Sequence, residues 1–76
     1  MQLVWQERPA RNERVRVAAW TCPFHATSYE LCRLGGQSHI RRILRTEDGE
    51  VIHETYQWPV RKAEEVWRAL LKGHVV

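Results

Sequence analysis

Arginine is the residue whose abundance in this sequence points most clearly to chemistry. The chain has 12 basic and 9 acidic side chains, and ten of the basic ones are arginines. Residues 1–46 carry eight basic and three acidic side chains, whereas residues 47–76 carry four and six. Guanidinium groups bind phosphates and guanine edges through a planar fork of N–H donors. A surface that gathers several of them indicates an anionic partner, although a GC-rich genome also produces an excess of arginine.

Two cysteines and two histidines offer a second kind of chemistry. Cys22-x2-His25, together with Cys32 and His39, makes a chemically plausible tetrahedral zinc set. The chain has no Cys-x2-Cys pair, however, and a cysteine in a strand is more often a small apolar residue. We therefore predict reduced thiols and no metal site. Nucleophile elbows, phosphate-binding loops and acidic dyads are missing from the sequence, so we predict neither an enzyme nor a cofactor.

The length and composition indicate one small globular domain. The chain has 76 residues, of which 43% are hydrophobic and 28% are charged. A chain of this size is too short for most enzyme folds. Its apolar runs are too short to span a bilayer, and its N-terminus lacks the pattern of a secretory signal. We predict a cytoplasmic protein with no membrane partner.

Alternating apolar and polar residues predict four strands, which are followed by a helix. The strands cover residues 14–22, 28–34, 37–46 and 51–58. Pro59 and Gly73 then bound a segment with apolar residues at helical spacing. The apolar stripe of this segment comprises Val60, Ala63, Trp67, Leu70 and Leu71. The predicted fold is α+β: a four-stranded antiparallel sheet (ββββα) with one C-terminal amphipathic helix packed on one face. Residues 1–13 are predicted to form an extended basic arm, and residues 14–76 a single domain.

The turns between the strands determine which side chains share a face. Residues 35–36 predict a two-residue turn, and residues 47–49 predict a three-residue turn that pairs Thr46 with Glu50. The face beneath the helix then comprises Tyr29, Leu31, Ile40, Leu44, Ile52, Tyr56 and Trp58. A two-residue turn at the second position would move the last strand by one residue and exchange its two faces.

The opposite face is the predicted binding surface, and its expected partner is nucleic acid. It comprises Glu30, Cys32, His39, Arg41, Ile43, Arg45, Val51, His53 and Thr55, with Arg14 and Arg16 beside them. The four arginines of this face are predicted to neutralise phosphates, while His39 and Thr55 add polar contacts. Arg8 and Arg11 extend this surface into the arm. The alternative is a protein-interaction or homodimerisation module, in which Trp20, Ile43 and Val51 form a mixed apolar patch.

The last three predicted strands and the helix also resemble known DNA-binding domains. Residues 38–71, SHIRRILRTEDGEVIHETYQWPVRKAEEVWRALL, are similar to the three-strand-plus-helix domains of tyrosine recombinases and AP2-type factors. The matching positions are Ile40-Arg41-Arg42, Asp48-Gly49, Thr55-Tyr56, and Ala63-Glu64 with Trp67. The resemblance implies that the exposed sheet face enters the major groove through Arg41 and Arg45. Residues 57–60 and the extra leading strand depart from the pattern. The ββββα order is also similar to transcription-coactivator domains that bind single strands as dimers, although their glycine before the helix is missing.

Overall fold

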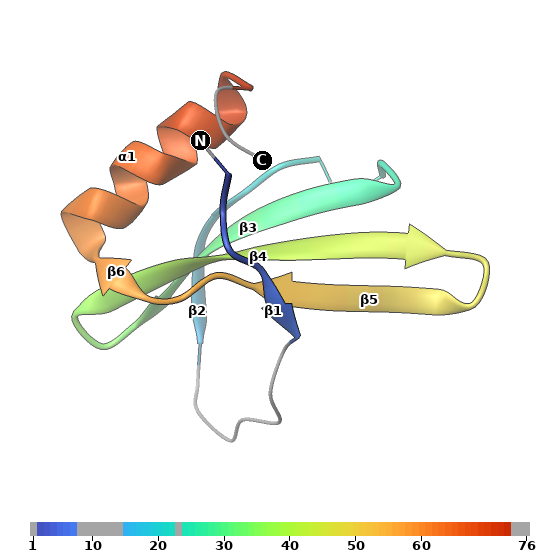
Figure 1. Ribbon diagram of the computed structural model, residues 1–76, viewed down its shortest axis with the longest axis horizontal. Coiled ribbons are helices and arrows are strands. Elements are labelled where there is room, and N and C mark those ends of the chain that lie inside the picture. Colours follow the sequence, from blue (N-terminus) through green and yellow to red (C-terminus); the bar gives the residue numbers. More distant parts are fainter. Residues whose placement is uncertain (1, 8–14, 23, 74–76) are drawn as a thin grey trace.

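The computed structural model describes residues 2–7, 15–22 and 24–73. Its elements are β1 (Gln6–Glu7), β2 (Arg16–Trp20), β3 (Thr27–Leu34), β4 (Gln37–Thr46), β5 (Gly49–Glu54), β6 (Trp58–Pro59) and α1 (Val60–Leu71). The strands form one antiparallel sheet in the order β1-β5-β4-β3-β2, and β6 pairs with the start of β4. Figure 1 shows α1 on one side of the sheet, above the end where β6 lies. The α+β class is therefore confirmed, with two short strands added to the four that the sequence predicts.

The first hairpin forms in the predicted register. Leu34 pairs with Gln37, so the turn between β3 and β4 has two residues. Gly35 has a φ of 62°, a left-handed conformation that glycine adopts without a steric penalty. The alternation along both strands then places the odd-numbered residues of β3 and the even-numbered residues of β4 on the side of α1. The other side of the sheet is called the open face below.

The second hairpin corrects the predicted register by one residue. Thr46 pairs with Gly49 instead of Glu50, so the turn consists of Glu47 and Asp48 alone. The Thr46 hydroxyl stabilises this shorter turn, because it accepts a hydrogen bond from the Asp48 N–H at 3.2 Å and donates one to the Gly49 carbonyl at 3.0 Å. The faces of β5 are exchanged as a result. Val51 and His53 lie on the helix side, and Ile52 and Glu54 lie on the open face.

A bulge after β5 returns the chain to the register that the sequence predicts. Ser38 pairs with Trp58, so residues 55–57 lie opposite only two residues of β4. Thr55 holds this bulge: its N–H donates to the Ile40 carbonyl at 2.9 Å, and its hydroxyl accepts from the Ile40 N–H at 3.0 Å. The same hydroxyl donates to the Tyr56 carbonyl at 3.0 Å. Trp58 consequently packs against the core as predicted, whereas Tyr56 is exposed.

The hydrophobic core lies between α1 and the helix side of the sheet. It comprises Leu3, Leu31, Ile40, Ala63, Val66, Trp67 and Leu70. Gly73, with a φ of 77°, ends the helix as predicted and donates its N–H to the Leu70 carbonyl. Leu71 is exposed instead of buried, and Val66 contributes in its place. The buried residues of α1 follow helical spacing, so the amphipathic pattern positions the helix.

Residues 2–7, which belong to the predicted arm, contact the core and the sheet. Leu3 is buried in the core, Trp5 packs against it, and β1 pairs with β5. The alternation of Leu3 and Trp5 supplies apolar side chains to a small core, which explains why residues 2–7 join the sheet. Arg8, Arg11 and Arg14 lie outside the described residues. Within the part of the chain that the structure describes, no helix is long and apolar enough to cross a membrane.

Candidate functional site

The predicted nucleic-acid-binding residues do not share one exposed surface. His39 and Arg41 lie on the open face as predicted, but His39 has no exposed area and the Arg41 side chain is only 11% exposed. Thr55 is buried in the bulge. Arg16 is exposed but pairs with Arg33, whose side chain reaches the helix, so Arg16 lies on the helix side. Among the six predicted residues, Arg14 falls outside the described ranges.

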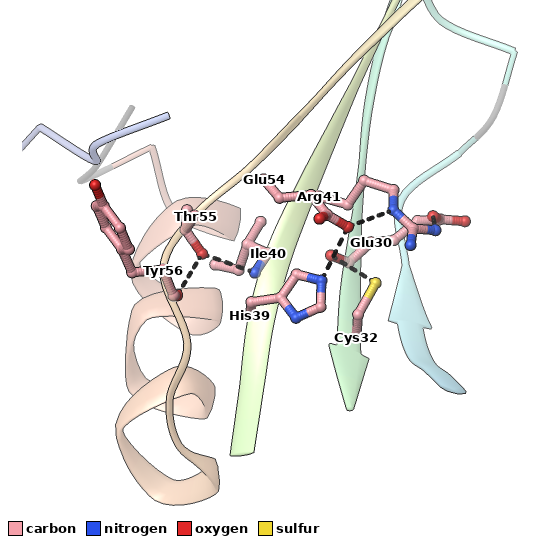
Figure 2. Close-up of polar contacts among 8 residues, drawn as sticks. All are labelled: Glu30, Cys32, His39, Ile40, Arg41, Glu54, Thr55 and Tyr56. Atoms are coloured by element: carbon pink, nitrogen blue, oxygen red, sulfur yellow. Dashed lines mark hydrogen bonds and ion pairs between the residues drawn. The ribbon is translucent and has the colours of Figure 1, made fainter. Parts of the chain in front are cut away.

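A network of charged side chains occupies the centre of the open face. Figure 2 shows His39 and Arg41, both from β4, pointing at the carboxylate of Glu54 on β5. The His39 Nε2 lies 3.0 Å from the Glu54 Oε2, and the Arg41 Nε donates to the same oxygen at 3.1 Å. Arg41 Nη1 also donates to the Glu30 Oε1 on β3 at 3.0 Å. Three adjacent strands are thus joined by one arginine, whose side chain is only 11% exposed and therefore poorly accessible to a phosphate.

The same contacts shift the pKa values of the network. Burial on its own would raise the pKa of the Glu54 carboxyl, but the hydrogen bonds and charges of His39 and Arg41 outweigh burial and lower it below its ordinary value. Burial also acts against the charge of Arg41, yet the nearby Cys32, Glu54 and Glu30 raise its pKa. Both Glu54 and Arg41 are therefore charged in the folded protein at neutral pH. The network is a buried ion pair with added hydrogen bonds.

Arg45 is the more accessible of the two predicted phosphate-binding arginines that lie on the open face. It lies two residues beyond Ile43 on the open face, and its side chain is 33% exposed. Its Nη1 donates to the His25 carbonyl at 3.0 Å and to the Ser28 hydroxyl at 2.9 Å. Its Nε lies 3.5 Å from the Glu50 carboxylate. On the described strands β3, β4 and β5, the open face carries three glutamates against two arginines, so its charge does not match that of a polyanion.

An apolar hollow lies beside Arg45 on the same face. Its volume is about 320 Å³, and its lining comprises Val17, Trp20, Thr21, Ser28, Tyr29, Glu30, Ile43 and Arg45. The Trp20 residue is 66% exposed and pairs with Glu30 at the edge of the sheet. Ile43 also lines the hollow and pairs with Ile52 on β5. The hollow therefore combines an exposed indole at its rim with aliphatic side chains beneath it.

This hollow refines the apolar patch that the sequence predicts. Trp20 and Ile43 lie together as expected, but Val51 is on the helix side because of the two-residue turn. Ile52 takes the place of Val51, and Val17 is added from β2. The signal that could have identified Ile52 was the length of the turn at residues 47–48. Val17 lies on the same face as Trp20 because β2 has an irregularity in register between Val17 and Ala19.

The cysteines and histidines do not form a metal centre within the described ranges. Cys22 and His25 are exposed, whereas Cys32 and His39 are buried as neighbours on β3 and β4. Among residues 2–7, 15–22 and 24–73, no group of three or more His, Cys, Asp or Glu side chains is arranged to hold a metal ion. Neither cysteine forms a disulfide.

No family model, no curated protein and no solved structure matches the chain. The resemblance to the DNA-binding domains of tyrosine recombinases and AP2-type factors thus stays an expectation drawn from a few residues. The open face and its hollow are the features on which a function must be argued.

Proposed function

We propose that this protein is a non-catalytic protein-interaction module, which binds a partner polypeptide through the hollow beside Trp20. The observation that carries the proposal is the exposure of this indole next to an aliphatic floor. Tryptophan is among the residues most enriched at the energetic centres of protein interfaces. An apolar side chain of the partner would fill the hollow and cover the indole, and both would leave water.

The charges around the hollow support a polypeptide partner better than a nucleic acid. Arg41 is held by two glutamates, and Arg45 already donates to Ser28 and lies near Glu50. Phosphate binding depends on cations that are free to release counterions, and these two are engaged within the protein. Nucleic-acid binding by Arg14, Arg16, His39, Arg41, Arg45 and Thr55 stays a prediction. In the test below it is the competing outcome.

The proposal includes a cytoplasmic location and non-covalent association. Cys22 and Cys32 are not joined in a disulfide, and reduced cysteines fit a reducing compartment. Cys22 is exposed, so in an oxidising compartment it would be open to disulfide exchange. Partner binding through an apolar hollow needs neither thiol.

The test uses a phage-displayed peptide library selected against the folded full chain. We expect selected peptides to carry an aromatic or large aliphatic side chain. Trp20→Thr should lower their affinity by about tenfold or more, as loss of an interface hot spot does. Phe24→Thr is the matched control, because Phe24 is 93% exposed but does not line the hollow. Peptides that bind both variants equally would overturn the proposal.

A parallel titration with single-stranded and duplex 20-mer DNA and RNA at low salt distinguishes nucleic-acid binding from peptide binding. We expect no saturable binding that responds to Arg45→Ala. The proposal would be overturned if oligonucleotide binding weakened in Arg45→Ala and fell with salt, while Trp20→Thr left peptide binding unchanged. The protein would then bind nucleic acid, as the sequence predicts. Sedimentation velocity of the unmodified chain shows whether a second copy is the partner, since Trp20→Thr would then abolish a concentration-dependent dimer.

A further inference from the structure

A second hollow lies on the helix side of the molecule, distant in the fold from the open face. It is enclosed by the N-terminal segment, the bulge after β5 and the first two turns of α1. Its volume is about 230 Å³. The bulge creates it, because Trp58 turns toward the core while Tyr56 stays 60% exposed at the rim. Leu3 closes its inner end, since this side chain is part of the core.

The lining of this hollow has an apolar part and a polar part. Leu3, Val4, Trp58 and Val66 supply hydrocarbon and aromatic surface. The remaining lining residues are Gln2, Tyr56 and Lys62, and none of the lining residues is acidic. Lys62 is exposed and has no ion pair within the described part of the chain. A ligand that enters this hollow therefore meets an unpaired ammonium group beside an aromatic wall.

The surface around the hollow also favours a negative ligand. The exposed residues of α1 include Arg61, Lys62 and Arg68, and the exposed Lys72 follows directly after the helix. Glu65 is the exposed acidic residue of this helix, whereas Glu64 is engaged by Arg33 at 3.0 Å. The helix thus presents more positive than negative charge to solvent, and this field attracts anions toward Lys62.

We infer that this hollow binds a small amphipathic anion, in which a carboxylate is carried by an aromatic or branched apolar body. The apolar body would lie against Trp58 and Val66, and the carboxylate would face the Lys62 ammonium. Tyr56 and Gln2 can donate further hydrogen bonds to the same group. The volume is below the roughly 300–1,000 Å³ of sites for drug-sized ligands, which limits the body to about one fused ring system. The site is independent of the proposed interaction module, because the two share no residue.

The test compares three probes that differ in charge but share one ring system: 2-naphthoate, 2-naphthamide and 2-naphthylmethylamine. Each is titrated into the isotope-labelled full chain, and amide chemical shifts are followed by NMR. For a ligand of this size we expect 2-naphthoate to bind with a dissociation constant of about 0.1–1 mM. Its shifts should centre on Tyr56, Trp58, Lys62 and Val66. The neutral amide should bind about threefold to tenfold more weakly, and the cationic amine more weakly still.

Charge variants on α1 provide the decisive comparison. Lys62→Met keeps an apolar stem but removes the ammonium, so 2-naphthoate should then bind no better than 2-naphthamide. Lys62→Arg should retain the preference for the anion. Lys72→Met is the matched control, because Lys72, directly after the end of α1, is also exposed but does not line the hollow. Equal affinities in Lys62→Met and Lys72→Met, equal binding of the anion and the cation, or shifts centred on Trp20 would each overturn the inference. None of these outcomes depends on whether the open face binds a peptide.

Discussion

The centre and the edge of the open face differ in which kind of side chain they bury and which kind they expose. At the centre, charged side chains are buried: Glu54 and His39 are almost inaccessible, and Arg41 joins them to Glu30. At the edge, the apolar side chain of Trp20 is exposed. The usual distribution of charge outside and apolar surface inside is thus reversed on this face. The comparison indicates that the charges stabilise the fold and that the apolar edge is available for binding.

The number of arginines in a sequence is therefore a poor measure of the positive charge that a partner meets. A buried arginine whose hydrogen bonds are filled by carboxylates contributes to cohesion between strands, and its field is cancelled locally. The predictions below separate the two regions by their expected effects on stability, beginning with the largest.

Glu54→Gln should cause the largest loss of stability. It leaves the buried Arg41 without one of its two carboxylate partners and replaces a charged acceptor of His39 with a neutral amide. Removing one partner of a buried ion pair typically costs about 3–5 kcal/mol. Urea denaturation followed by tryptophan fluorescence measures this change in the free energy of unfolding.

Glu50→Gln is the matched control, because Glu50 lies on the same strand and the same face and also faces an arginine. Its side chain is 56% exposed, and its distance to Arg45 is 3.5 Å. Exposed ion pairs contribute about 0–1 kcal/mol, so the control should be close to the unmodified chain. Similar losses in the two variants would contradict a special role for the buried centre.

Acid should weaken the same contact without a mutation. The pKa of Glu54 is lower in the folded chain than its ordinary value of 4.5. A carboxyl of this kind contributes stability above pH 4.5, and the contribution is lost as pH falls through the folded pKa. The free energies of unfolding of the unmodified chain and Glu54→Gln should therefore differ most near pH 7 and converge below pH 4.5. A constant difference from pH 7 to pH 2 would show that the charge of Glu54 is not what stabilises the fold.

Thr55→Val should have a smaller effect, which tests the bulge. Valine has nearly the same shape but cannot accept the hydrogen bond of the buried Ile40 N–H. An unsatisfied buried donor costs about 1–3 kcal/mol. Thr55→Ser retains the hydroxyl and should recover most of this loss in the same urea measurement. If Thr55→Ser and Thr55→Val are equally destabilised, the methyl group and not the hydroxyl holds the bulge.

The bulge also explains how far the fold could be predicted from the sequence. The strands and the helix follow from local alternation and spacing, and Gly35 identifies the first turn directly. At the second turn, the signal of Gly49 fits a loop of two or three residues, and the Thr46 hydroxyl decides in favour of two. The resulting shift exchanges the faces of β5. The bulge at Thr55 then reverses the shift. Trp58 therefore lies on the helix side as the pattern predicts, although β5 does not have the predicted register.

The candidate site could be predicted only in part, for a related reason. Alternation correctly places Arg41 and Arg45 on the face opposite the helix. Whether they are free depends on which acidic residues lie opposite them on β5, and that pairing follows from the register of the second hairpin. A register that pairs Thr46 with Glu50 would place Glu54 beside Arg42 on the helix side, whereas Glu54 lies opposite Arg41. A one-residue difference thus turns an apparent anion-binding arginine into one that is neutralised by its neighbours.

Trp20→Thr should have the smallest effect on stability, and this result would sharpen the comparison most. Threonine keeps a high strand propensity, and the indole is 66% exposed, so little buried surface is lost. We expect a change in the free energy of unfolding of about 0.5 kcal/mol or less, as for most surface positions. Trp67→Ala provides the contrast, because Trp67 is buried under the sheet and its removal should cost about 3–5 kcal/mol. A loss above about 2 kcal/mol in Trp20→Thr would mean that the indole is a structural side chain like Trp67. A small loss, combined with weaker peptide binding, would show that this tryptophan is exposed for a partner, because folding would then gain almost nothing from it.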